Sequence, residues 1–175
     1  MKKTIIAAFC VLVALPAGAQ SIGEKTGVDS ALGVTPSTED FVKQAAMSDM
    51  FEIQSSQLAL QKADAPAKTF AQRMIADHQK TTADMQAMIK SGAVKVQPPS
   101  ALDSAMQGRL DKLKKETGRD FTNTYDEDQV SVHKDAVSLF ERYAKGGDNT
   151  QLKDWAGRML PTLQQHLQMA QGLNK

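Results

Sequence analysis

Apolar residues recur at steps of three and four along most of the chain, which is the spacing of amphipathic helices. The first such pattern predicts a helix over 39–61. Ser37 and Asp40, three residues apart at its start, resemble a capping box. A second helix is expected to follow Asp64, with Pro66 in its first turn. The link between them is short, so the two helices should form an antiparallel pair.

A segment from Gly92 to Ser100, which contains Pro98 and Pro99, interrupts the helical pattern. A short amphipathic helix is expected between Leu102 and Gly118. A third long helix, capped by Asp120, should end at Gly146 and Gly147, and a fourth should start at Asp148 or Asn149 and reach Leu173. No segment rich in Val and Thr alternates as a strand would. The pattern therefore predicts an all-α fold: a four-helix bundle with a short extra helix in the crossover between helices 2 and 3, occupying residues 38–175.

All three histidines of the chain fall on the apolar seams of these predicted helices. His78 lies on the second, His133 on the third and His166 on the fourth, and the first supplies Glu52 on its corresponding row. Each position is near the middle of a helix of about 25 residues, and a mid-length position stays at mid-height whichever way its helix runs. We therefore expect the four side chains to meet in one layer.

Two explanations of such a layer remain open on the sequence. The histidines and Glu52 could bind a metal ion, since bundles build such sites from facing helices and unpaired buried imidazoles are costly. Alternatively, they could form a hydrogen-bonded network with buried water. As metal ligands they would suit zinc, copper or iron, with Asp126 as an additional carboxylate. Asp77 directly precedes His78 and should point about 100° away from it, a direction more typical of a solvent-facing residue.

Pro161 lies within the fourth predicted helix, one turn before His166. It lacks an N–H and crowds the carbonyl of Gly157, so a bend is expected there. Its simplest role is structural, although the bend could also aim His166. No catalytic nucleophile arrangement and no Gly-rich phosphate loop is present, so the sequence assigns no catalytic residue.

The N-terminus has the pattern of a cleavable secretory signal. Lys2 and Lys3 precede an uncharged apolar run, and the Ala-Gly-Ala segment at 17–19 predicts cleavage after Ala19. A signal peptide over 1–19 and a flexible leader over 20–37 are expected, together with a periplasmic location. The only cysteine, Cys10, lies inside the signal, so the mature chain should contain neither thiol nor disulfide.

The balance of charged residues argues against nucleic acid as a partner. Of the 21 Lys and Arg residues, two lie in the signal, so 19 remain against 20 acidic residues. Such a balance lacks the basic stripe that nucleic-acid binding requires. The apolar run of the signal is shorter than the roughly 20 residues of a membrane span, and the mature chain is expected to contain no span.

Several motifs resemble the DUF4142 family of exported bacterial proteins, of unknown function, over about residues 39–173. They are Glu39-Asp40-Phe41-Val42, Arg73-Met74-Ile75-Ala76-Asp77-His78, Gly118-Arg119-Asp120-Phe121, His133-Lys134-Asp135-Ala136-Val137 and Leu160-Pro161-Thr162-Leu163-Gln164-Gln165-His166-Leu167. The resemblance implies a ferritin-like bundle in a bacterial envelope protein, and it supplies no reaction.

Ferritin-like di-iron proteins place a Glu three residues before two of their histidines. Here Ile75, Val130 and Leu163 occupy those places, which argues against a di-iron oxidase. Two other functions are favoured over a di-iron oxidase. One is a periplasmic metal-binding bundle, and the other is a metal-free envelope or stress-response protein that works through its surface.

Overall fold

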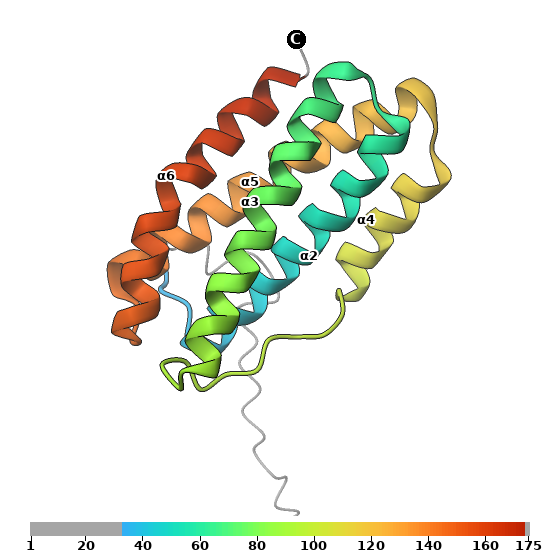
Figure 1. Cartoon of the computed structure of the whole chain (residues 1–175). Coiled ribbons are helices and arrows are strands. Elements are labelled where there is room, and N and C mark those ends of the chain that lie inside the picture. Colours follow the sequence, from blue (N-terminus) through green and yellow to red (C-terminus); the bar gives the residue numbers. More distant parts are fainter. Residues whose placement is uncertain (1–32, 174–175) are drawn as a thin grey trace, which may run out of the picture.

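The computed structural model describes residues 33–173, and all five helices within that range belong to one bundle (Figure 1). The four long helices are α2 (Thr38–Lys62), α3 (Ala65–Lys90), α5 (Gly118–Gly146) and α6 (Thr150–Leu173). The short helix α4 (Ser104–Lys115) lies in the crossover between α3 and α5 and packs against α2 and α5. The predicted all-α bundle with an extra crossover helix is thus confirmed. The expected signal and most of the leader lie outside the described residues.

The chain enters its first long helices at the predicted residues. The Ser37 hydroxyl accepts a hydrogen bond from the backbone N–H of Asp40 (3.1 Å), and Asp64 Oδ1 accepts one from the N–H of Ala67 (3.1 Å). Asn149 caps α6 in the same way through the N–H of Leu152 (3.0 Å). These side chains satisfy N–H groups that the first turn of a helix leaves without partners.

The start of α5 differs from the prediction. Thr117, not Asp120, is its N-cap residue, and Thr117 makes no side-chain capping bond. Gly118 has a φ of +58°, a left-handed conformation that glycine adopts without a Cβ clash. Only Glu116 and Thr117 separate the two helices, so the chain turns from α4 into α5 earlier than expected.

Around the bundle the long helices follow the order α2, α3, α6, α5, and each packs against two other long helices. As Figure 1 shows, α2 and α6 run in one direction and α3 and α5 in the other. The long crossover is therefore needed to return the chain before α5 begins. Within residues 33–173, no helix combines the length and the apolar character that crossing a membrane requires.

The core consists of two apolar clusters stacked along the bundle axis. The first contains an aromatic group in which Phe41 stacks on Tyr143 at 4.1 Å between ring centroids, with Phe140 and Trp155 edge-on to Phe41. The second contains Phe51, Phe70, Phe121 and Tyr125, among others. Buried polar residues gather where the two clusters meet and extend into the second: Asp49, Glu52, Ser55, Ser56, His78, Thr81, Gln129, His133 and His166. The apolar core is thus interrupted at mid-height by a polar layer.

Candidate metal centre

Three histidine rings meet in the polar layer, each carried by a different helix. His78 lies on α3, His133 on α5 and His166 on α6, and the three residues are between 1% and 3% exposed. Their ring centroids are 5.5 to 5.7 Å apart in all three pairs. The expectation that the seam histidines converge at one height is confirmed.

One nitrogen of each ring is held by a protein acceptor. His78 Nδ1 lies 2.8 Å from Asp49 Oδ1, and His166 Nε2 lies 2.8 Å from Asp77 Oδ2. His133 Nδ1 lies 2.9 Å from the backbone carbonyl of Gln129. Because a carboxylate or carbonyl accepts, each of these ring nitrogens carries the proton and donates it. The tautomer and the orientation of every ring are therefore set from outside the cluster.

The other nitrogen of each ring has no hydrogen-bond partner among the described residues. These atoms are His78 Nε2, His133 Nε2 and His166 Nδ1. One ligand nitrogen from each of the three rings lies within 4.8 Å of those of the other two. Tetrahedral coordination with zinc–nitrogen bonds of about 2.0 Å requires separations of about 3.3 Å. The rings must therefore move closer together to share one ion.

Glu52 lies beside this cluster, as its position on α2 predicts. Its side chain is completely buried, neither carboxylate oxygen has a hydrogen-bond partner, and Oε1 is 3.9 Å from His133 Nδ1. Burial raises the pKa of Glu52 to about 7, although the charge of His78 opposes the rise. Glu52 thus approaches the ring of His133 from the side that donates to Gln129. It must turn toward the other ring nitrogens to share an ion with them.

The surroundings favour neutral imidazoles at two of the three rings. Burial and the charge of His78 lower the pKa of His133 to about 3. Burial also lowers the pKa of His166, with Asp77 opposing it. At His78 burial acts in the same direction, but the hydrogen bond and the charge of Asp49 outweigh it and raise the pKa. His133 and His166 therefore favour the neutral form that binds metals, whereas Asp49 shifts His78 toward its protonated form.

Further buried hydrogen bonds tie the layer to α2 and α5. Tyr125 and Ser56 share a hydrogen bond of 2.9 Å between their hydroxyls, and Gln129 Nε2 donates to Ser55 Oγ at 3.3 Å. The carbonyl of Gln129 is the group that holds His133. These contacts fix the backbone and side chains around the cluster, which limits how far the rings can move.

The sequence analysis missed one residue that holds a histidine and misjudged another. Asp49 lies three residues before Glu52, hence on the same face of α2, but in a neighbouring row of side chains. Asp77 was expected to face solvent; its side chain is partly exposed, but it also contacts His166. A helix in a bundle has two neighbours, so a side chain turned 100° away from His78 on α3 can reach α6 while it still borders water. The available signals were a carboxylate three residues before the seam Glu52 and one directly before the seam His78.

Asp126, the additional carboxylate considered from the sequence, lies outside the cluster that the histidines form. It is 3% exposed and lines a cleft at the end of the bundle with Asp64, Arg119 and Asn123. Burial, with a contribution from the charge of Asp64, raises its pKa to about 6. Its position one heptad before His133 corresponds to about 10 Å along the helix, so a shared face did not bring it to the same height.

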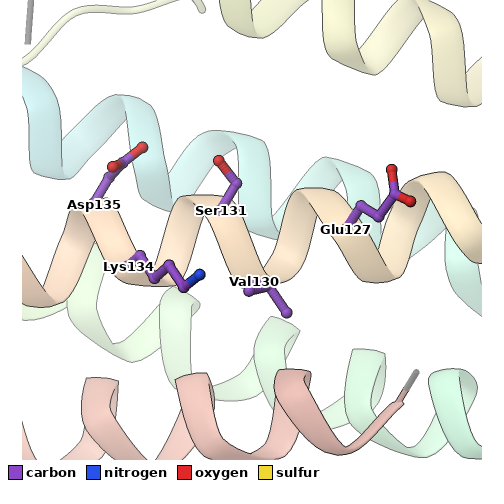
Figure 2. Close-up of a pocket in the computed structure, with 5 residues that line it drawn as sticks. All are labelled: Glu127, Val130, Ser131, Lys134 and Asp135. Carbon is purple, nitrogen blue, oxygen red and sulfur yellow. The ribbon is translucent and has the colours of Figure 1, made fainter. Parts of the chain in front are cut away.

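A second depression lies on the outer face of α5 and is distinct from the histidine cluster. Its lining residues all belong to α5: Glu127, Val130, Ser131, Lys134 and Asp135. Figure 2 shows Glu127, Ser131 and Asp135 on one side of the helix and Val130 and Lys134 on the other. Both charge signs are present and no histidine contributes, so the buried cluster is the stronger candidate site.

The fold and the cluster together define an all-helical bundle with three preoriented histidines in its interior. The sequence profile described as domain of unknown function (DUF4142) matches residues 23–173, and the chain belongs to this family. No curated protein and no solved structure matches the chain. Membership of this family does not indicate a reaction, so a proposal about function depends on the geometry of the site.

Proposed function

We propose that the protein binds one divalent transition-metal ion inside its bundle, through His78, His133 and His166, with Glu52 as a fourth donor. The observation that carries this proposal is the pairing of one held and one unpartnered nitrogen on every ring. Histidines that bind metals usually donate their second N–H to a carboxylate or carbonyl, which orients the ring and increases its basicity. All three rings have this arrangement.

The chemistry of the converging atoms supports a cation. At His133 and His166, whose surroundings favour the neutral ring, the nitrogen that is not held presents only a lone pair, so it can accept but cannot donate. Within residues 33–173 no hydrogen bond joins the three rings to one another or to Glu52. Leaving a buried polar atom unpaired costs about 1 to 3 kcal/mol. One metal ion would remove several such penalties together.

The donor set suits zinc, copper or iron. Imidazole binds all three metals, whereas magnesium and calcium prefer oxygen ligands. Carboxylate-supported histidines, as at Asp49 and Asp77, are frequent around zinc. Storage, sensing or an oxidative reaction would each use such an ion, and knowing which ion binds would separate them.

Metal analysis of the purified full-length protein tests the proposal. The protein is incubated with Zn²⁺, Cu²⁺ or Fe²⁺ salts, dialysed against buffer and analysed by inductively coupled plasma mass spectrometry. We expect about one equivalent of at least one metal, and loss of that metal in His78→Ala and His166→Ala variants. A Lys80→Ala variant, which alters an exposed residue of α3, the helix that carries His78, should still bind the metal.

The histidine variants are essential because the thiol of Cys10 could bind metal on its own. Less than a tenth of an equivalent of every metal would overturn the proposal and favour a metal-free bundle that acts through its surface. Binding that survives the loss of both histidines would place the ion elsewhere and would overturn it equally.

We also propose that the protein acts in the periplasm. The support is the N-terminal pattern of Lys2, Lys3, an apolar run and small residues at 17–19. Cell fractionation and mass spectrometry of the purified protein would check this. A mature N-terminus at Gln20 in the periplasmic fraction is expected, and an intact Met1 in the cytoplasm would contradict it.

A further inference from the structure

A continuous chain of contacts leads from the histidine cluster to the protein surface between α3 and α6. His166 Nε2 lies 2.8 Å from Asp77 Oδ2, and the same oxygen accepts from Arg73 Nε at 3.2 Å. Arg73 also donates through Nη2 to Gln165 Oε1 on α6 at 3.1 Å. The side chain of His166 is 1% exposed, whereas those of Asp77 and Arg73 are 34% and 44% exposed.

The two other groups that hold rings are buried. Asp49 is 4% exposed and Gln129 is completely buried, and both lie in the middle of the polar layer. Asp77 is therefore the only one of the three that borders solvent. Moving it would free His166, the ring carried by α6, without opening the apolar clusters.

We propose that Arg73 is a latch on the metal site, and that metal enters and leaves between α3 and α6 when Arg73 releases Asp77 and Gln165. This inference rests on the proposed metal binding at His78, His133 and His166. In the latched state Arg73 joins the two helices across the surface and holds Asp77 against His166. In the released state Asp77 turns outward with its negative charge, where it can meet an incoming cation first.

A latch predicts a particular kinetic behaviour. It raises the barrier in both directions, so weakening it accelerates binding and release equally and leaves the dissociation constant unchanged. If Arg73 acted only through its positive charge, the rates would change differently. Removing a charge that repels the metal ion speeds binding, slows release and tightens the complex. The two rates together separate these explanations.

Three variants test the latch, with one control. Arg73→Ala removes it, whereas Arg73→Lys keeps the charge but loses the planar fork that reaches two acceptors. Gln165→Ala removes the contact with α6 and leaves every charge in place. Lys80→Ala breaks the exposed Lys80–Asp84 ion pair elsewhere on α3 and serves as the control. All three substituted positions are on the surface, so folding should be preserved.

The assay measures the rates of Zn²⁺ uptake by stopped flow and of Zn²⁺ release to a chromogenic chelator, with Cu²⁺ replacing Zn²⁺ if zinc does not load. For Arg73→Ala we expect both rates to rise about fivefold, which corresponds to about 1 kcal/mol in the barrier. Arg73→Lys and Gln165→Ala should show smaller increases in the same direction. In Arg73→Lys and Gln165→Ala, which keep every charge, the dissociation constant should stay within about twofold of the wild-type value, a change of less than about 0.5 kcal/mol. Lys80→Ala should match the wild type.

Unchanged rates in all three latch variants, with normal metal loading, would overturn the latch while the proposed metal binding stands. Faster uptake with tighter binding in Arg73→Ala, and no change in Gln165→Ala, would show a charge effect and would also overturn it. Failure of the wild-type protein to bind any metal would be a failure of the proposed function itself, and the loading experiment detects that separately.

Discussion

Replacing Glu52 with Gln should make the metal-free protein more stable, and more so at high pH. Glu52 is completely buried without a hydrogen-bond partner, and burial raises its pKa from 4.5 to about 7. The folded protein therefore holds this proton more tightly than the unfolded chain does. The associated stability is fully present below about pH 4.5 and is lost as the pH rises through about 7.

The size of the effect follows from the displacement of the pKa. A rise from 4.5 to about 7 corresponds to about 3 kcal/mol of folding free energy, since each pH unit is worth about 1.4 kcal/mol. At about pH 8 most of this amount opposes folding of the wild type, whereas at about pH 5 less than about 1 kcal/mol does. Glutamine has the same shape and does not ionise, so Glu52→Gln should remove this pH dependence.

Urea unfolding in the presence of EDTA, followed by the fluorescence of the single tryptophan, Trp155, measures the difference. The variant should gain about 2 to 3 kcal/mol over the wild type at about pH 8 and much less at about pH 5. Glu127→Gln, at an exposed position of α5, is the matched control and should show no such difference. An equal effect at both pH values, or a variant less stable at about pH 8, would refute the reasoning.

Three other substitutions probe the histidine support, the core and a cap. Asp49→Asn removes the charge that accepts from His78, and it should weaken metal binding about 10- to 100-fold in a competition titration. Phe41→Ala removes a fully buried ring of the aromatic cluster and should cost about 3 to 5 kcal/mol in urea unfolding followed by circular dichroism, while a cost below about 1 kcal/mol would contradict the described packing. Asn149→Ala leaves the N–H of Leu152 without its cap and should cost about 1 kcal/mol, against no measurable change if the start of α6 frays in the wild type.

The sequence predicted the bundle well because its signals are local and repeated. Ser37, Asp64 and Asn149 each cap the helix that the apolar spacing had already indicated. The end of α4 and the start of α5 were harder, because a left-handed glycine at Gly118 allows a two-residue link that no cap announces. Boundaries that depend on one backbone conformation leave little trace in a hydrophobic pattern.

The site was predictable to the extent that helical geometry determines height and face. His78, His133 and His166 were placed together from their seam positions alone, and the structure brings their rings within 5.7 Å of one another. Asp77 could not be assigned this way. Its contact with His166 depends on which helix lies beside α3, and that is a property of the bundle's topology.

The location of the polar layer explains how the fold can accommodate it. Unpaired buried groups at Glu52 and the three histidines lower stability, and the apolar clusters above and below supply the burial that offsets this loss. Because each cluster joins residues from all four long helices, the helix ends are held on both sides of the layer. The rings therefore stay preoriented without hydrogen bonds to one another. A site that kept its geometry only when metal was bound would not need Asp49, Asp77 and the carbonyl of Gln129 to hold each ring from outside.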